Sequence, residues 1–168
     1  VPESVVHLLR DAASECPEAP ALFFEGTRLN YAEYAGLVGV VARRLGAHAG
    51  VGDRVVLLMR NSLDLAVATL AVHALRAQVV ALNPGYSERE LALMLADAEP
   101  AMVLFDDSDG VDPRRLCPHL AAEAFWPTGD GRGLVGLLAQ SCALPELLPC
   151  HDDLAVLQLR LLRSHAVG

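Results

Sequence analysis

Short apolar runs alternate with amphipathic segments through much of this 168-residue chain. The clearest example lies between Val51 and Tyr86, where apolar runs at residues 54–59 and 79–82 flank an amphipathic segment at residues 63–77. Short apolar runs are typical of buried strands, and the segment between them is long enough for the helical crossover that parallel strands require. The pattern therefore predicts a strand–helix–strand unit.

The residues before this unit predict a helix and a hairpin. A helix over residues 4–15 is followed by Pro17, and residues 21–30 predict a hairpin that turns at Gly26-Thr27. Pro lacks a backbone donor and Gly tolerates positive φ, so both residues are suited to such boundaries.

Two capping patterns mark the starts of longer helices. Asn30 with Glu33, and Ser87 with Glu90, have the spacing at which two side chains satisfy each other's backbone N–H groups. A third apolar run follows at residues 101–105. Because all three runs are apolar throughout rather than alternating, they predict parallel strands covered by helices on both faces. The expected fold class is α/β, with αβα layers and a mostly parallel sheet.

The pattern weakens after the third run. Residues 106–132 are rich in Asp, Gly and Pro, and they predict a loop-rich surface with one helix near residues 114–123. Residues 134–140 predict a short helix, and residues 154–158 predict the start of another strand.

Composition and charge narrow the class of protein. The 21 acidic and 13 basic residues give a net charge of −8 without any basic block, which argues against nucleic-acid binding. All basic residues are Arg, so this chain offers no lysine amine for catalysis. The four cysteines form no C-x-x-C pair, the N-terminus lacks a signal-peptide pattern, and no apolar run is long enough to span a membrane. We expect a cytoplasmic protein.

A glycine-rich motif is the first candidate for chemistry. GRGLVG, from Gly131 to Gly136, has the spacing of a dinucleotide-binding fingerprint. A working fingerprint follows a strand and opens a helix, whereas the preceding residues, FWPTGD, are typical of a loop. The sequence favours a flexible loop over a nucleotide-binding turn.

Histidines and acidic residues provide weaker candidates. His151-Asp152-Asp153, beside Cys150, could be drawn as a metal cluster, but adjacent loop residues rarely converge on one ion, so we expect no metal site. His73 lies on the predicted crossover helix and is expected to be a core histidine rather than a base.

Polar residues directly after three predicted strands are the best positional candidates for binding. They are Asn61, Asn83 and Asp106. Ligands of parallel sheets bind beyond the carboxyl ends of the strands, which favours a binding role. The alternative is that each short polar side chain caps a helix or a turn. The sequence assigns no catalytic residue.

Three stretches resemble the N-terminal part of the adenylate-forming superfamily, which comprises acyl-CoA synthetases, luciferases and peptide-synthetase adenylation domains. They are PEAPALFFEGTRLNYAEY at residues 17–34, the long stretch at residues 50–106, and HDDLAVLQ at residues 151–158. The LNYAEY and NPGYSEREL segments are most similar to carboxylic acid–CoA ligases. We therefore predict an N-terminal subdomain at residues 1–158 and a tail outside the family at residues 159–168.

The resemblance implies a parent reaction in which ATP and Mg convert a small carboxylic acid to an acyl-adenylate, followed by transfer to coenzyme A. The tail, LRLLRSHAVG, does not match the phosphate-binding loop that family members carry there, and a frameshift after Gln158 is one hypothesis for it. We expect a truncated acyl-CoA synthetase-like fragment of fatty acid metabolism that is inactive alone, binds no cofactor and self-associates through an uncovered side of its sheet.

Two alternatives to this reading stay open. The chain could serve as a non-catalytic α/β interaction module. It could also be a nucleotide-binding domain that uses Gly131 to Gly136.

Overall fold

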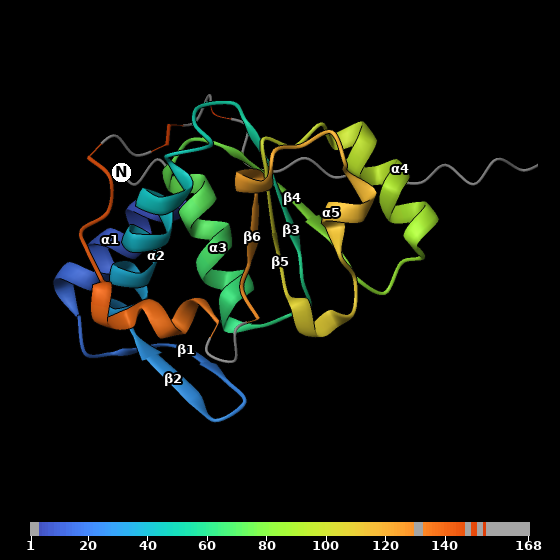
Figure 1. The fold of residues 1–168 in the computed structure, drawn as a ribbon. Coiled ribbons are helices and arrows are strands. Elements are labelled where there is room, and N and C mark those ends of the chain that lie inside the picture. Colours follow the sequence, from blue (N-terminus) through green and yellow to red (C-terminus); the bar gives the residue numbers. More distant parts are fainter. Residues whose placement is uncertain (1–3, 130–132, 147–148, 151–152, 154–168) are drawn as a thin grey trace, which may run out of the picture.

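The predicted strand–helix–strand unit is present in the computed structural model, which describes residues 4–129, 133–146, 149–150 and 153 (Figure 1). It consists of β3 (Arg54–Leu58), α3 (Leu63–Ala74) and β4 (Gln78–Leu82). The two strands pair in parallel along their whole length. The helix ends before the predicted residue 77, because Arg76 has a φ of 61° and leaves the helical conformation.

The sheet contains two more parallel strands. β5 (Met102–Phe105) pairs with the other side of β3, and β6 (Phe125–Pro127) pairs with β5, so the strand order is β4-β3-β5-β6. The predicted parallel sheet is therefore confirmed. β6 lies in the region predicted to be rich in loops, and this strand was not predicted, because three residues are too few to give a recognisable pattern.

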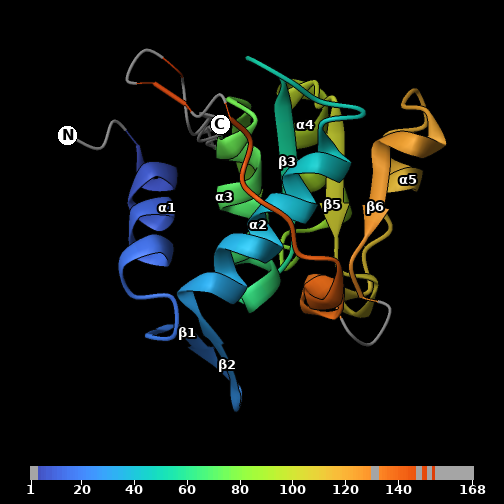
Figure 2. The same cartoon turned by 90° about the vertical axis from the view of Figure 1, so that its left-hand side faces the viewer.

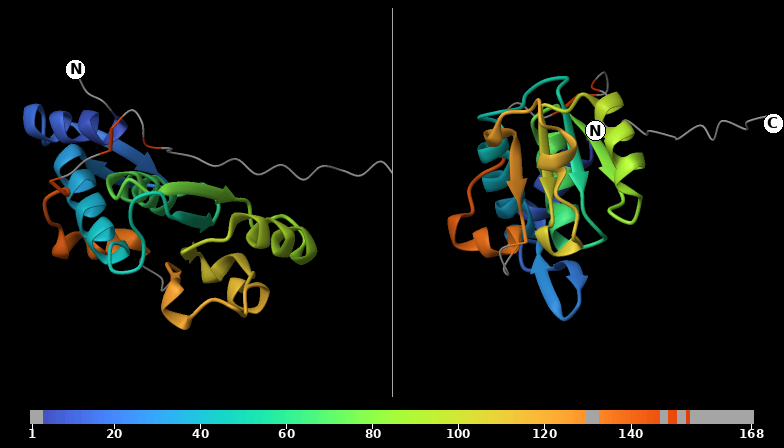
Figure 3. Two further views of the ribbon diagram at one scale, coloured as in Figure 1. Left: turned by 90° about the horizontal axis from the view of Figure 1, so that it is seen from above. Right: turned by 45° about the vertical axis from the view of Figure 1, so that its right-hand side comes forward.

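Helices cover both faces of this sheet. α1 (Val5–Glu15), α2 (Tyr31–Leu45) and α3 lie on one face, and α4 (Glu88–Ala98) and α5 (Pro113–Leu116) lie on the other (Figure 3). Alternate strand residues enter two separate hydrophobic clusters, one under each helical layer. Burial on both faces explains why the strands are apolar throughout. The predicted αβα layering is confirmed.

Both predicted capping boxes are present. The Asn30 side chain accepts the Glu33 N–H at 2.8 Å, and the Glu33 carboxylate accepts the Asn30 N–H at 2.9 Å. Ser87 and Glu90 make the equivalent pair at the start of α4. The sequence therefore fixes the starting points of α2 and α4 through local contacts.

The N-terminal hairpin projects from one end of the molecule (Figures 1 and 2). It is formed by β1 (Pro20–Phe24) and β2 (Thr27–Asn30), which pair antiparallel. The turn lies one residue earlier than predicted: Glu25 and Gly26 have positive φ, at 47° and 83°, whereas Thr27 already pairs with Phe24. Two successive positive φ values suit a tight turn between strands.

The segment after β5 contains short, irregular helices: η1 (Asp107–Asp109), η2 (Ala122–Ala124) and η3 (Leu134–Gln140), all of 3₁₀ type. The predicted helix at residues 114–123 was wrong in extent, since α5 ends at Leu116. Cys117 precedes Pro118, and a residue before proline is disfavoured in the helical conformation. The predicted helix at residues 134–140 exists but is a 3₁₀-helix.

Residues 141–146, here called the α2 strap, run across α2 (Figure 2). The Cys142 N–H donates to the Gly36 carbonyl at 3.3 Å. A Cβ on Gly39 would collide with the Cys142 and Ala143 carbonyl oxygens, so the strap needs a glycine at that position. The predicted strand at residues 154–158 and the predicted tail at residues 159–168 lie outside the described residues.

Helix length and apolarity also bear on membrane association. Within the part of the chain that the structure describes, no helix is both long enough and apolar enough to cross a bilayer.

Candidate functional site at the carboxyl edge of the sheet

The four strands point the same way, so their carboxyl ends share one edge of the sheet, on the side from which the hairpin projects (Figure 1). Two neighbouring hollows lie along this edge. The larger one, of about 630 Å³, lies beyond β3 and β4, and the smaller one, of about 360 Å³, lies beyond β5 and β6. This is the edge at which parallel sheets bind ligands.

Asn61 and Asn83 both line the larger hollow. The structure therefore brings these two predicted candidates together. The remaining walls combine apolar side chains with one cation and backbone, namely Met59, Arg60, Leu65, Ala81, Leu82 and Gly85. The hollow thus combines apolar and polar groups, and a few polar groups among apolar walls are what fix the orientation of a small molecule in a binding site.

The two asparagines differ in the hydrogen bonds that their side chains make within the fold. The Asn83 side-chain oxygen accepts the Gly85 N–H at 2.8 Å and so closes the turn after β4. No described residue accepts from its amide N–H groups, which can therefore donate to a ligand. Asn61 is exposed and directly precedes Ser62, whose hydroxyl caps α3 by accepting the Leu65 N–H at 3.1 Å. Capping at the start of α3 is thus performed by Ser62, and Asn61 is left at the rim.

Arg60 is a rim residue that the sequence did not single out. Its Nε lies 2.9 Å from Asp109 Oδ1, and its backbone N–H donates to the same carboxylate at 3.3 Å. The Arg60 side chain is nevertheless 72% exposed. The contact with Asp109 joins the end of β3 to η1. Arg60 could have been predicted at this rim from the sequence, because it directly follows the apolar run at residues 54–59.

Asp106 lines the smaller hollow and is separated from the asparagines. Its Oδ1 accepts the Ser108 N–H at 2.8 Å and the Ser108 hydroxyl at 2.6 Å, so the side chain caps η1. This is the capping alternative considered for it. Thr128, directly after β6, lines the same hollow, and its hydroxyl donates to the Phe105 carbonyl at 3.3 Å. Thr128 was missed because β6 was not recognised.

The described part of the glycine-rich motif begins at Gly133. A strand, β6, does precede the motif, so the expectation of a loop there was wrong. The following helix is η3, and the Leu134 N–H at its start donates to Asp64 Oδ1 at 2.8 Å. A carboxylate of α3 therefore occupies a backbone donor that a nucleotide-binding turn would offer to phosphate.

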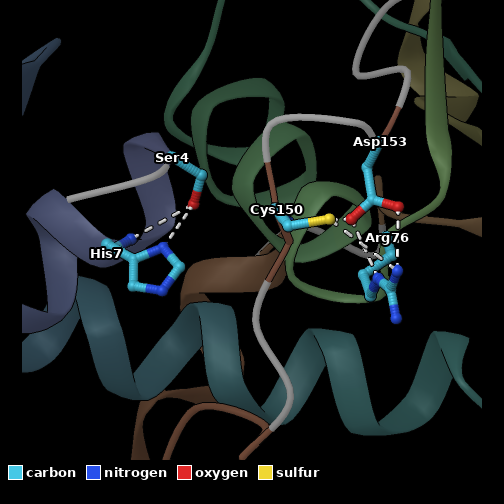
Figure 4. Close-up of polar contacts among 5 residues, drawn as sticks. All are labelled: Ser4, His7, Arg76, Cys150 and Asp153. Carbon is cyan, nitrogen blue, oxygen red and sulfur yellow. Dashed lines mark hydrogen bonds and ion pairs between the residues drawn. The ribbon is translucent and has the colours of Figure 1, made fainter.

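Asp153 and Cys150 lie at the opposite edge of the sheet and contact Arg76 (Figure 4). Arg76 donates to Asp153 from Nε at 2.8 Å and from Nη2 at 3.1 Å, while Asp153 Oδ2 also accepts the Cys150 N–H at 2.9 Å. The hydrogen bonds from Arg76, then from Cys150, lower the pKa of Asp153 from 3.8 to about 2. Residues 151 and 152 of the acidic run lie outside the described residues.

The structure also defines the environments of two histidines, His73 and His7. His73 is 9% exposed within α3, which agrees with its predicted core position. Among the described residues, no group of three His, Cys, Asp or Glu side chains is arranged to hold a metal ion. Figure 4 also shows His7 beside Ser4, whose side chain caps α1.

Comparison with known sequences identifies the class of protein. The sequence model of the AMP-binding enzymes matches residues 9–146. The chain therefore belongs to this family of adenylate-forming enzymes.

Individual relatives are considerably longer than this chain. Surfactin synthase subunit 3 of Bacillus subtilis is 34% identical over 101 residues, which cover 60% of this chain and 8% of that protein. The oxalate–CoA ligase of Arabidopsis thaliana is 32% identical over 100 residues, which cover 58% of this chain and 20% of the ligase. The chain thus spans a small part of the curated relatives it matches.

Solved structures share the fold. The N-terminal domain of FACL13 from Mycobacterium tuberculosis superimposes with a TM-score of 0.76 at 23% sequence identity. The match covers 92% of this chain and 40% of that one. The predicted family membership and fold class are confirmed.

Proposed function

We propose that this chain is the N-terminal part of a carboxylic acid–thiol ligase of the acyl-CoA synthetase type. In the parent reaction a carboxylate attacks the α-phosphate of ATP, pyrophosphate leaves, and an acyl-adenylate forms. A thiol such as that of coenzyme A then attacks the acyl carbonyl, and AMP leaves. The family match over residues 9–146 carries this proposal, and the similarity to an oxalate–CoA ligase supports the thiol acceptor.

Within this ligase, the chain supplies the parallel sheet and the hollow beyond β3 and β4. Asn61 and Asn83 are the proposed ligand contacts, because they share a hollow with apolar walls and present amide groups at its rim. Asp106 is assigned a capping role, because its Oδ1 accepts hydrogen bonds from two groups of Ser108. ATP, Mg and coenzyme A belong to the parent reaction, in which residues beyond this chain take part.

The 168-residue chain is expected to form no acyl-adenylate by itself. Adenylyl transfer depends on electrostatic stabilisation by metal ions, backbone dipoles and cationic side chains that surround the phosphates. The match to FACL13 covers 40% of that domain, so most of the corresponding ligase is contributed by other residues. The chain also contains no lysine.

ATP-dependent pyrophosphate release tests this proposal. The purified chain is incubated with ATP, Mg and a panel of fatty and aromatic acids, and the oxalate–CoA ligase of Arabidopsis thaliana with oxalate serves as the positive control. Amino acids are included because of the similarity to surfactin synthase. We expect release only in the control. Acid-dependent release by the 168-residue chain would contradict its proposed inactivity.

A further inference from the structure

The two hollows at the carboxyl edge of the sheet differ in charge. Among the described residues that line the larger hollow, Arg60 is the only charged one. The smaller hollow is lined by the carboxylates of Glu25, Asp64 and Asp106, and by no cation among the described residues. The chain as a whole has a net charge of −8, so the cation at the larger hollow contrasts with the rest of the molecule. An anionic ligand is therefore favoured by the larger hollow and repelled by the smaller one.

Arg60 is the exposed half of an ion pair with Asp109. Its Nε lies 2.9 Å from Asp109 Oδ1, and its backbone N–H donates to Asp109 Oδ2 at 3.3 Å. The Asp109 side chain is only 9% exposed, whereas the Arg60 side chain is 72% exposed. The carboxylate is thus the buried end of the pair and the guanidinium is the accessible end. A ligand at the rim meets mainly the positive charge, because the nearer charge contributes more to the potential.

The guanidinium of Arg60 has hydrogen-bond donors that the fold does not use. Arginine carries five N–H donors and no acceptor. The contact with Asp109 is made through Nε, and no described residue accepts a hydrogen bond from the terminal nitrogens Nη1 and Nη2. Paired N–H groups of this kind match two oxygens of a carboxylate or of a phosphate. Arg60 is therefore equipped to hold an anionic oxygen group.

Asn83 adds donors to the same hollow. Its side-chain oxygen is engaged by the Gly85 N–H at 2.8 Å, and no described residue accepts from its amide N–H groups. What Asn83 offers to a ligand is therefore a donor rather than an acceptor. Since Arg60 and Asn83 both line the larger hollow and both present donors, the matching ligand group is one that carries several acceptor oxygens.

We propose that Arg60 makes the larger hollow specific for an anionic oxygen group, a carboxylate or a phosphate. Asn83 donates to the same group, and the apolar walls, which include Met59 and Leu65, hold the adjoining hydrocarbon. This inference rests on the proposed function, because the larger hollow is the proposed ligand-facing part of the ligase. The alternative is a purely structural Arg60, whose ion pair with Asp109 only links the end of β3 to η1.

Calorimetric titration of the 168-residue chain with hexanoate, hexyl phosphate and uncharged hexanamide tests the proposal. The three probes share an apolar chain and differ in the head group. We expect at least one of the two anions to bind about tenfold more tightly than hexanamide, because only an anion gains a charge-assisted contact with Arg60. The tighter anion shows whether a carboxylate or a phosphate is preferred. Its binding should weaken as the salt concentration rises from about 0.05 M to about 0.3 M.

Variants assign the preference for an anion to Arg60. Arg60→Gln should abolish the preference and leave hexanamide binding unchanged, whereas Arg60→Lys, which keeps the charge, should retain part of it. Asp109→Asn breaks the same ion pair but keeps the cation, so it should weaken anion binding less than Arg60→Gln does. Arg43→Gln, at an exposed arginine in the last turn of α2, is the matched control and should change none of these affinities.

Three results would overturn the proposal. The first is that the unaltered chain binds neither anion more tightly than hexanamide. The second is a preference for the anion that persists in Arg60→Gln. The third is an equal loss of anion binding in Arg60→Gln and Asp109→Asn, which would show that only the link between β3 and η1 matters.

Two further points keep the test decisive. If Arg60→Gln does not fold, the salt dependence of the unaltered chain decides, and anion binding that is insensitive to salt would refute the proposal. None of these titrations requires an acyl-adenylate to form. A failure here is therefore distinguishable from a failure of the proposed ligase function, which pyrophosphate release measures.

Discussion

Residues 51–105 and residues 133–153 are held in the fold by different kinds of contact. The first region is built from parallel strands that pair along their length and from the helices that pack on them. In the described residues of the second region, η3 and the α2 strap pack apolar side chains against the core that contains α2 and α3. Individual polar contacts add to this packing and join Leu134 to Asp64, the strap to Gly36, and Asp153 to Arg76. The comparison shows that the sheet and its helices provide a surface, on which the later segment is held by apolar packing and by a few specific polar contacts.

The largest expected effect comes from a change in the first region. Leu57, on the central strand β3, is fully buried. Leu57→Ala removes buried apolar surface and leaves a cavity, and it should lower the free energy of unfolding by about 3 kcal/mol in urea denaturation. Leu93→Ala, on the exposed surface of α4, is the control and should cost less than about 0.5 kcal/mol. Equal effects of the two would contradict the core position of β3.

Gly39→Ala tests how the α2 strap is bound. In an isolated helix, alanine would be more favourable than glycine. Here its methyl group would collide with the Cys142 and Ala143 carbonyls, so we expect a net loss of about 1–3 kcal/mol in urea unfolding. Gly50→Ala is the control, since no atom lies within 4 Å of its added Cβ. Stabilisation by Gly39→Ala would show that the strap does not lie on α2 in solution.

A smaller effect is expected where α2 meets α3. The buried Tyr34 hydroxyl donates to the Ala66 carbonyl at 3.0 Å, and burial raises its pKa to about 12. Tyr34→Phe should cost about 1 kcal/mol at neutral pH. Because the folded pKa lies above the unfolded value of 10, this contribution is complete below pH 10 and is lost as the pH rises toward 12.

Thermal unfolding of Tyr34→Phe and of the unaltered chain at several alkaline pH values measures the effect. Tyr86→Phe, at a half-exposed tyrosine, is the control. A stability difference for Tyr34→Phe that does not shrink above pH 10 would contradict the assignment.

The smallest expected effect concerns Asp153 in the second region. Its folded pKa, about 2, lies below the ordinary 3.8, so the contact with Arg76 stabilises the fold above about pH 4 and is lost as the pH falls toward 2. The stability difference between the unaltered chain and Asp153→Asn should therefore vanish over this range in chemical denaturation. Asp97→Asn, at an exposed aspartate, is the control. A constant difference for Asp153→Asn would mean that the ion pair is absent.

Features that depend on residues close in sequence could be predicted, whereas features that depend on distant contacts could not. Capping boxes and apolar runs depend on residues close in sequence, which is why Asn30, Ser87 and the first three parallel strands were identified. β6 was missed because three residues carry no periodicity. The extent of α5 was overestimated because the effect of Pro118 on Cys117 was not considered.

The candidate site was predicted in part. Strand ends placed Asn61, Asn83 and Asp106 at one edge of a parallel sheet. The sequence did not reveal that two of them share a hollow while Asp106 caps η1, because that division depends on how η1 and β6 pack against β5. The contact between Asp64 and Leu134, which joins residues far apart in sequence, was equally invisible.

The central functional claim is that the ligand-facing part of this chain is the hollow beyond β3 and β4 rather than the glycine-rich turn. The most direct test is an NMR titration of the chain with a non-hydrolysable acyl-adenylate analogue, an acyl sulfamoyl adenosine. We expect saturable shifts of the side-chain amide signals of Asn61 and Asn83, with the backbone signals of Gly133 and Gly136 unchanged. Shifts confined to Gly133 and Gly136, or no response at either asparagine, would contradict it.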